Sequence, residues 1–275
     1  MDGWLCAHNR HTIAQMAPVH SPHDPAWAES DLSADPHRSA NKAERVRRMF
    51  SSIAHRYDLN NRVHSFGLDQ AWRRAAVRAA QPKSTDTVLD VACGTGDLSL
   101  AFLRHGVGSV LGVDFTPAMV NIARQKSAGR EHISFEVGDA QALRFADGSF
   151  DVVSIAFGIR NVQDPRRAIA EFARVLRPGG RLVVLEFAEP AGPLVRSLHR
   201  WYTHTLMPRT AALIAGDREG AYAYLPRSVE TFLNPQELGA AIGGAGFEPV
   251  QRRLLTFGTC AITVSSRCRT MMTTA

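Results

Sequence analysis

A short segment between residues 87 and 98 carries the side chains best suited to chemistry. It reads TVLDVACGTGDL, so that an apolar run contains Asp90 and a turn contains Gly94 and Gly96. Asp97 is placed to cap the helix that the following apolar residues predict. A strand, a glycine turn and a helix in this order form the opening unit of a nucleotide-type binding site, where glycine lets the backbone approach a ligand.

A second acid follows the next apolar run. Asp114 ends this run, which reads VLGV at 110–113. An acid at this point can accept two hydrogen bonds from the hydroxyls of a bound ribose. Together with the glycine turn, Asp114 indicates a cofactor that contains adenosine.

The spacing of the glycines discriminates among adenosine cofactors. A dinucleotide fingerprint needs a third glycine or alanine, and Ser99 stands there instead; no Gly-Lys-Ser or Gly-Lys-Thr triplet of a P-loop follows. The pattern Asp-x-x-x-Gly-x-Gly at 90–96 resembles the first motif of class I S-adenosylmethionine-dependent methyltransferases. An acid at Asp90 suits a cationic amino-acid cofactor and does not suit a pyrophosphate. The alternative is a glycine turn without a ligand, and Asp114 makes that alternative less favourable.

Apolar runs and helical patterns alternate along the rest of the chain. Strands are predicted near 87–92, 109–114, 133–138, 150–157 and 181–187, with helices at about 97–105, 116–127 and 165–177. A helix at about 235–245 and two strands near 248–256 and 259–266 follow. The alternation predicts an α/β fold with a doubly wound, mostly parallel seven-stranded sheet and helices on both faces.

The segments around this sheet complete the expected organisation. Two helices, at about 41–57 and 68–80, are predicted within 41–81, and 193–232 predicts a helical insertion after the fifth strand. We expect one domain over 41–267, with the insertion on the substrate side, and a short tail over 268–275. Residues 1–40 contain four prolines and no sustained periodicity, so we expect a disordered extension there.

Composition limits the class of protein. The chain has 275 residues and is 45% apolar, which is typical of one globular α/β domain. Its four cysteines are scattered without metal-binding spacing, so we expect no metal, no disulfide framework and a cytoplasmic location. No apolar run is long enough to cross a membrane, and the first ten residues do not resemble a signal peptide.

Three segments outside the glycine turn resemble one enzyme family. They are FSSIAHRYDLNNRVHSFGLDQAWRR at 50–74, FGIRNVQDPRRAIAEFARVLRPGGRLVVLEF at 157–187 and HTLMPRTAALIAGDREGAYAYLPRSVETF at 204–232. Over roughly 41–265 the chain is similar to the UbiE/MenG/Coq5 family of quinone-ring C-methyltransferases in ubiquinone and menaquinone biosynthesis. RYDLNN with SFGLDQAWRR, and FGIRNVQD with LEF, are more specific signals than the glycine turn.

The strand ends place the candidate cofactor-binding residues on one edge of the sheet. Thr95 is expected to donate to the carboxylate of S-adenosylmethionine, and Asp139 to accept from its adenine amino group unless it serves a strand-end turn. Tyr57 is expected to cover the cofactor unless it is a core tyrosine. The predicted cofactor-binding residues are Tyr57, Asp90, Gly94, Thr95, Gly96, Asp114, Asp139, Ala140 and Ala156.

Arg160 and Asn161, after the fourth strand, are the predicted catalytic residues. From the residues alone, Arg160 is as well explained as a surface arginine paired with Asp164, and the resemblance favours a function. Because arginine stays charged, Arg160 is expected to stabilise a developing phenolate or to orient a water that takes the proton. Asn161 is expected to hold either one by hydrogen bonding.

The resemblance implies C-methylation of a polyprenylated quinol, of the demethylmenaquinol or 2-methoxy-6-polyprenyl-1,4-benzoquinol type. Methyl transfer from a sulfonium is an in-line displacement, for which the protein supplies alignment and charge placement. A quinol ring carbon becomes nucleophilic when a ring hydroxyl loses its proton. The sequence does not rank the candidate bases of the insertion, which are Tyr202, His204, Asp217, Tyr222 and Tyr224.

Three other functions fit parts of the sequence. A methyltransferase for another small molecule, such as a secondary metabolite, would share the cofactor half and differ in 193–232. The net charge of +6 raises nucleic acid as a partner, but the chain has neither an appended RNA-binding module nor the N/D-P-P-Y/F motif of exocyclic-amine methylation. A non-catalytic subunit of a biosynthetic complex is disfavoured by the intact motif residues.

Segment 41–81 suggests an approach to the membrane. Its nine bases and three acids give a net charge of +6 on two predicted helices. Because the expected acceptor carries a polyprenyl tail, we expect salt-sensitive peripheral binding to anionic lipid through Arg45, Arg47 and Arg48. A lid with an ordinary basic exterior is the alternative, and a homodimer or a biosynthetic complex is left open.

Overall fold

The sheet of the protein has the predicted doubly wound form. The computed structural model describes residues 25–190, 192–215, 217 and 219–269. The seven strands are β1 (Thr87–Val91), β2 (Ser109–Asp114), β3 (Ile133–Val137), β4 (Phe150–Ala156), β5 (Leu176–Phe187), β6 (Gln251–Leu255) and β7 (Cys260–Ser266). They lie in the order β3-β2-β1-β4-β5-β7-β6, and β7 runs antiparallel to both of its neighbours.

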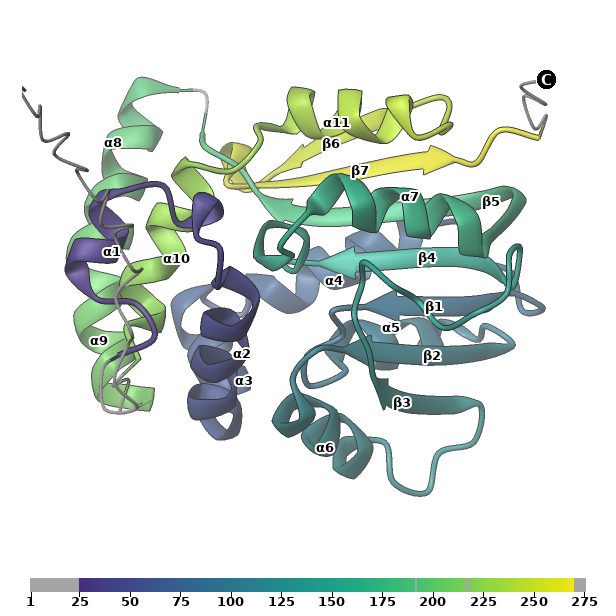
Figure 1. The fold of residues 1–275 in the computed structure, drawn as a ribbon, viewed down its shortest axis with the longest axis horizontal. Coiled ribbons are helices and arrows are strands. Elements are labelled where there is room, and N and C mark those ends of the chain that lie inside the picture. Colours follow the sequence, from purple (N-terminus) through teal and green to yellow (C-terminus); the bar gives the residue numbers. More distant parts are fainter. Residues whose placement is uncertain (1–24, 191, 216, 218, 270–275) are drawn as a thin grey trace, which may run out of the picture.

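Helices cover both faces of this sheet (Figure 1). They are α4 (Leu68–Ala79), α5 (Asp97–His105), α6 (Pro117–Lys126), α7 (Pro165–Val175) and α11 (Pro235–Gly244). Successive side chains of β4 point to opposite faces of the sheet and pack into two hydrophobic cores. Val153 packs in the core that contains α7 and α11, and Val152 packs in the core that contains α4 and α5. A strand buried on both faces reads as a continuous apolar run, which is why periodicity located the parallel strands closely.

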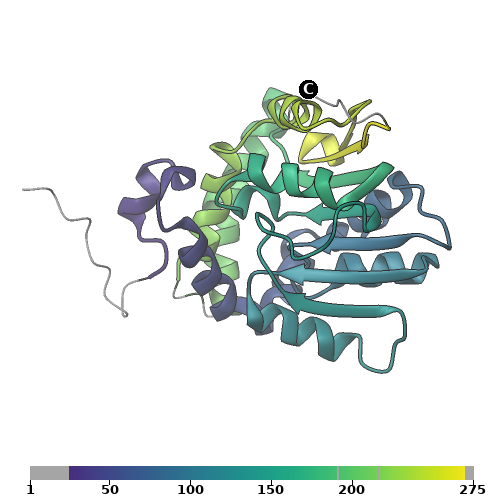
Figure 2. The same cartoon turned by 45° about the vertical axis from the view of Figure 1, so that its right-hand side comes forward.

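A second group of helices stands at the carboxyl ends of the parallel strands. It comprises α1 (Glu29–Ser33), α2 (Lys42–Ile53), α3 (Tyr57–His64), α8 (Pro193–Trp201), α9 (Met207–Ala215) and α10 (Ala221–Glu230). The arrowheads of β1, β2 and β4 point toward this group (Figure 1). Figure 2 shows the N-terminal helices beside those of 193–230, and contacts join α1 and α2 to α10 and α3 to α9.

The prediction of disorder over 1–40 is wrong for residues 25–40. Trp27 is 2% exposed and stacks on Tyr224 with ring centroids 4.6 Å apart, while the Ala26 amide donates to a carboxylate oxygen of Glu219. Helix α1 and a 3-10 turn at Pro36–Arg38 follow. The partners of this segment lie almost 200 residues away, so local periodicity carried no sign of them. Residues 1–24 and 270–275 lie outside the described residues.

Candidate functional site

Two neighbouring cavities open where the parallel strands end. The first, which we name the strand-end cavity, encloses about 100 Å³ between β1, β2, β4 and α2. The second, the apolar cavity, encloses about 300 Å³ between α3, α4, α8 and α10. Phe50, Tyr57 and Phe157 line both cavities and therefore form a shared aromatic wall. A ligand in one cavity lies directly across this wall from a ligand in the other.

The two glycines of the turn have different reasons to be glycine. Gly94 has a φ of +55°, and a Cβ there would meet only Tyr57, at 3.9 Å, so its backbone faces open space at the strand-end cavity. Gly96 has a φ of +83°, and a Cβ there would come within 2.9 Å of the Phe135 ring. Close backbone approach to a ligand therefore explains Gly94, whereas close packing of α5 on the sheet explains Gly96.

The expected capping role of Asp97 is wrong. Gly96 occupies the N-cap position of α5, and Asp97 is the first helical residue. The Asp97 carboxylate pairs instead with Lys126 and with Arg62 at 3.1 Å. The sequence pattern located the helix start correctly to within one residue and missed the long-range partners of its acid.

Asp114 lies in the strand-end cavity with its carboxylate fixed by the turn. One carboxylate oxygen accepts from the Gly94 amide and the other from the Thr116 amide, both at 2.8 Å. Burial raises the pKa of this carboxyl above its ordinary value, although both amide bonds oppose that rise. Each oxygen has a further lone pair, so the group can still accept two hydrogen bonds from a diol.

Two other predicted acceptors or donors stand behind the cavity wall. Asp90 is 1% exposed and accepts from the hydroxyls of Ser99 and Ser154, and burial raises its pKa to about 6. Thr95 is 2% exposed and donates to Asp58 at 2.6 Å. Neither side chain lines the strand-end cavity, and their observed partners indicate that they hold the turn in shape.

Six of the nine predicted cofactor-binding residues line the strand-end cavity, and Gly96, like Asp90 and Thr95, does not. The six are Tyr57, Gly94, Asp114, Asp139, Ala140 and Ala156. The Asp139 carboxylate also accepts from the Gln141 amide at 2.9 Å, so the turn interpretation of Asp139 holds alongside its place in the cavity. Apart from Tyr57, which begins α3, sequence position at a strand end was the signal that found these residues, because parallel strands end at one edge of the sheet.

Arg160 is a buried residue with a partner that the sequence analysis missed. Its guanidinium Nη1 lies 2.6 Å from a carboxylate oxygen of Glu186 on β5 and also donates to the Phe157 carbonyl. Both side chains are 5% exposed. Asp164 instead accepts from the amides of Arg166 and Arg167 as the N-cap of α7, so the surface pairing with Arg160 is excluded. Glu186 belongs to the LEF segment of the chain, but its spacing gave no sign of the pair.

Arg160 and Asn161 lie on opposite sides of the aromatic wall. Arg160 lines the apolar cavity, whereas Asn161 lines the strand-end cavity, donates to the Phe157 carbonyl and accepts from the Tyr224 hydroxyl. Phe157 has a φ of +58°, a left-handed conformation that costs a non-glycine residue about 1–3 kcal/mol. These hydrogen bonds to the Phe157 carbonyl hold its ring in the wall despite that cost.

The candidate bases differ in their surroundings. Burial raises the pKa of the Tyr222 and Tyr224 hydroxyls well above the ordinary range, which disfavours the phenolate that a base needs. Asp217 caps the start of α10 by accepting from two backbone amides and does not line the apolar cavity. His204 lines the cavity and lies 2.9 Å from Glu230, while Tyr202 donates to the His64 carbonyl.

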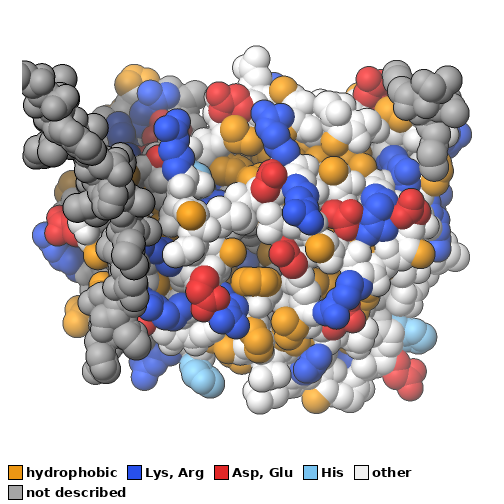
Figure 3. Space-filling model, viewed as in Figure 1, with side chains coloured by type: hydrophobic (Ala, Val, Ile, Leu, Met, Phe, Trp, Pro, Cys, Tyr) orange, Lys and Arg blue, Asp and Glu red, His pale blue; other side chains and the backbone are white. Residues whose placement is uncertain are grey.

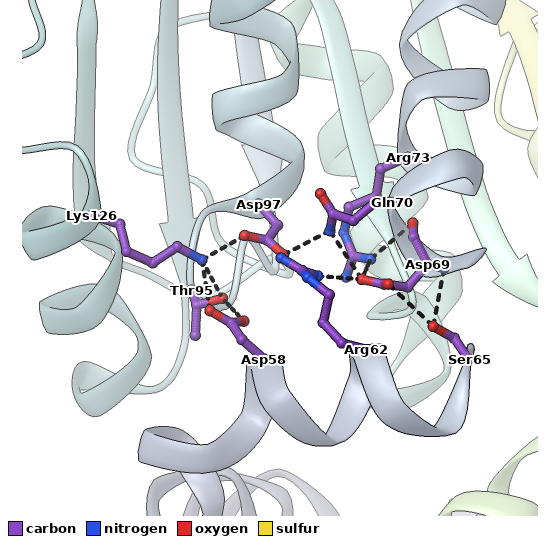
Figure 4. Close-up of polar contacts among 9 residues, drawn as sticks. All are labelled: Asp58, Arg62, Ser65, Asp69, Gln70, Arg73, Thr95, Asp97 and Lys126. Atoms are coloured by element: carbon purple, nitrogen blue, oxygen red, sulfur yellow. Dashed lines mark hydrogen bonds and ion pairs between the residues drawn. The ribbon is translucent and has the colours of Figure 1, made fainter. Parts of the chain in front are cut away.

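A charged network ties the helices of the apolar cavity to those of the sheet (Figure 4). Asp69, on α4, accepts from Arg62, Gln70, Arg73 and Ser65. Arg62 continues to Asp97 on α5, and Lys126 on α6 joins Asp97 to Asp58 on α3. Arg62 and Arg73 belong to the basic segment 41–81, and the spacing of the sequence gave no sign of their pairing with Asp69 and Asp97.

The family model shows what this arrangement belongs to. The model described as the ubiE/COQ5 methyltransferase family matches residues 38–267, which is most of the chain. The chain belongs to the ubiE/COQ5 methyltransferase family. The match covers both cavities, and the segments with the most specific resemblance, at 50–74 and 157–187, supply the shared aromatic wall.

Relatives within the ubiE/COQ5 family agree with this assignment. A demethylmenaquinone methyltransferase of Thermus thermophilus is 49% identical over 221 residues, which span 80% of this chain and all of the relative. A ubiquinone/menaquinone biosynthesis C-methyltransferase of Geobacter sulfurreducens is 43% identical over 231 residues, spanning 82% of this chain and 90% of the relative. This ubiE/COQ5 family member is therefore a methyltransferase enzyme.

Similar solved structures show the fold alone. A methyltransferase of Thermotoga maritima, titled S-adenosylmethionine-dependent and a possible histamine N-methyltransferase, matches with a TM-score of 0.56 and 21% identity over 81% of this chain and 99% of that chain. The [4+2]-cyclase SpnF matches with a TM-score of 0.60 and 18% identity over 82% of this chain and 96% of that chain. Because proteins of this fold carry out different reactions, the fold alone does not assign a reaction.

Proposed function

We propose that this chain transfers the methyl group of S-adenosylmethionine to a ring carbon of a quinol precursor of menaquinone or ubiquinone. The observation that carries the proposal is the shared wall of Phe50, Tyr57 and Phe157, which sets the strand-end cavity with its Asp114 carboxylate directly beside the larger apolar cavity. A methyl transfer needs donor and acceptor in line at close range. The names of the relatives supply the substrate class.

The strand-end cavity fits the cofactor. A Cβ at Gly94 would occupy open space at the cavity, and the Asp114 carboxylate beside it is fixed to accept from a ribose diol. Asp139 and Ala140 would hold the adenine end, and Tyr57 would cover the bound molecule. When bound, S-adenosylmethionine supplies an electrophilic methyl group on a sulfonium. Asp90 and Thr95 support cofactor binding indirectly, because they hold the glycine turn in shape.

The apolar cavity fits a quinol ring and the start of its tail. Its lining combines aromatic and aliphatic side chains with a few polar groups, among them Arg160. The ring carbon becomes nucleophilic as a ring hydroxyl loses its proton, and Arg160 stabilises the negative charge that develops on that oxygen. Glu186 holds the Arg160 guanidinium in place, and both are buried away from bulk water. His204, oriented by Glu230, is the best placed of the candidate bases.

Turnover of defined acceptors tests this proposal. The purified chain is incubated with labelled S-adenosylmethionine and a panel of demethylated benzoquinols and naphthoquinols, with unrelated phenols as controls, and the products are located by mass spectrometry. Label on a ring carbon of a quinol is the expected result. Label on a control phenol, with every quinol unchanged, would assign the chain to another small-molecule acceptor.

We also propose a peripheral approach to the membrane, at the mouth of the apolar cavity. Phe66 lines this cavity and is 79% exposed, and Phe257, between the lining residues Thr256 and Thr259, is 83% exposed. Exposed rings at a cavity mouth suit contact with acyl chains. No helix in the described part of the chain has the length and apolar character needed to cross a membrane.

The structure changes how this membrane proposal is tested. Each arginine of the expected basic surface has a carboxylate partner: Arg45 pairs with Asp31, Arg47 with Glu44 and Arg48 with Glu219. Such pairing weakens their attraction to anionic lipid, so we expect substitution of Phe66 and Phe257 by serine to reduce vesicle sedimentation more than glutamine at the three arginines. Equal sedimentation of wild type and the serine variant would refute contact through this mouth.

A further inference from the structure

Arg73 is a buried cation in the apolar cavity that the proposed function has not used. It lies on α4, is 6% exposed and lines the cavity. Its Nη1 donates to the carbonyl and to the carboxylate of Asp69, at 3.2 and 3.0 Å (Figure 4). Its Nε and Nη2 donate to no acceptor among the described residues. Neither nitrogen is among the buried atoms that lack a partner, so both are open to the cavity, where a ligand oxygen can accept from them.

Arg73 and Arg160 have matching positions on one aromatic pair. The guanidinium carbon of Arg73 lies 5.3 Å from the centroid of the Phe157 ring, and that of Arg160 lies 5.3 Å from the centroid of Phe187. The two rings lie against each other with centroids 4.5 Å apart. The Nη2 of Arg160 likewise donates to no acceptor among the described residues. Two guanidinium groups with spare donors therefore line the same cavity, one over each ring of this tilted pair.

The two arginines hold different places relative to the shared aromatic wall. The residue after Arg160, Asn161, lines the strand-end cavity. The residues of α4 that line a cavity, including Trp72 and Arg73, line the apolar cavity alone. The Arg73 guanidinium lies over Phe157, which lines both cavities. The Arg160 guanidinium lies over Phe187, which lines the apolar cavity alone. The two cations therefore meet a ligand in the apolar cavity at different points.

We propose that Arg73 binds the second oxygen of a 1,4-dioxygenated ring, para to the oxygen that Arg160 stabilises. This inference rests on the proposed function and adds a specificity determinant to it. Arg73 selects acceptors with oxygens at both ends of the ring. Its N–H donors favour binding of an oxygen, and not of an apolar group, at their end of the cavity. A phenol with one oxygen leaves the Arg73 donors unpaired and binds more weakly.

A comparison of two acceptors in three proteins tests this role. The acceptors are a short-chain 1,4-quinol and its analogue in which hydrogen replaces the hydroxyl para to the activated oxygen. We expect the wild type to prefer the quinol in kcat/KM by about 10- to 100-fold, the range for a hydrogen bond to a charged group. The preference should fall to within about threefold in Arg73→Met and persist in Arg74→Met, because the neighbouring Arg74 is exposed.

The controls separate specificity from structure and from the proposed function. If Arg73→Met lowers kcat/KM equally for both acceptors, Arg73 serves only the network with Asp69, and the inference is wrong. Calorimetry should give Arg73→Met the cofactor affinity of the wild type, and Arg73→Lys should restore part of the preference. Binding of both acceptors is measured alongside turnover. If the wild type methylates no quinol, the proposed function fails, while loss of the binding preference in Arg73→Met still supports the second-oxygen site.

Discussion

The buried pair of Arg160 and Glu186 couples catalysis to stability at the scale of single residues. Arg160→Met leaves Glu186 buried without its cation, which costs about 3–5 kcal/mol of the free energy of unfolding. The double variant Arg160→Met with Glu186→Gln removes both charges, and we expect it to recover most of that loss. Both variants should lose turnover and keep cofactor affinity, because the pair faces the apolar cavity.

Denaturant unfolding measures the stability of these variants, and calorimetry measures their affinity for the cofactor. Equal stability of the single and the double variant would show that the Glu186 charge is satisfied without Arg160. Wild-type turnover in the double variant would remove Arg160 from the reaction.

Asp114 links cofactor affinity to pH. Asp114→Ala should weaken cofactor binding by about 1–3 kcal/mol, because charge-assisted hydrogen bonds to the ribose are lost. Burial raises the pKa of this carboxyl, so its protonation should begin at a higher pH than for an exposed aspartate. The affinity of the wild type should therefore fall as pH is lowered through this range, and that of Asp114→Asn should not. Calorimetric titrations at several pH values distinguish the two, and parallel curves would contradict the assignment.

Lys42 makes the free energy of unfolding depend on pH in the alkaline range. It is 1% exposed, donates to the Val162 carbonyl, and burial lowers its pKa from 10.5 to about 8. Below pH 8 the lysine is charged in both states and its burial opposes folding. Between pH 8 and 10.5 the unfolded state binds more protons, so stability rises with pH by about 3 kcal/mol from this group. Lys42→Met should be the more stable protein at pH 7, and its advantage should shrink by pH 10. A difference that is constant with pH would show that Lys42 is not desolvated.

At the scale of the element, one glycine of the turn is expected to serve cofactor binding and the other to serve folding. Both Gly94 and Gly96 have positive φ, so alanine at either position costs about 1–2 kcal/mol of backbone strain. Gly94→Ala points its methyl group at the cavity, so we expect loss of cofactor binding with a folded protein. Gly96→Ala adds a clash with Phe135 and should unfold at a clearly lower temperature. Thermal melts and calorimetry on both variants check this, and a reversed pattern would contradict the assignment of their roles.

The elements that sequence located well are those whose environment is set locally. The parallel strands are buried on both faces and read as apolar runs, so their limits agree with the structure to within one residue, except that β5 begins at Leu176, five residues before the predicted start. Strand-end position then placed Asp114, Asp139 and Ala156 in one cavity. Features set by distant contacts escaped, because no local pattern records the stacking of Trp27 on Tyr224 or the pairing of Arg160 with Glu186.

At the scale of the whole molecule, the positive net charge of the sequence does not by itself make a basic surface. On the face shown in Figure 3, basic and acidic side chains alternate and neither sign forms a continuous patch. Much of the basic segment 41–81 is paired, as in the network of Arg62, Asp69 and Asp97. The charge excess in the sequence therefore overstated the attraction of this segment to a polyanion.

The cover of the strand-end cavity is also a wall of the apolar cavity, and this fixes an order of events. The segment from α2 to α3 contributes Phe50 and Tyr57 to both cavities. Displacing it to admit the cofactor dismantles the acceptor pocket, so the acceptor binds second and the methylated product leaves first. We expect steady-state kinetics of a sequential ordered type, with S-adenosylhomocysteine competitive against the cofactor and noncompetitive against the quinol. Competitive inhibition by the methylated product against the quinol would indicate instead that the two cavities fill independently.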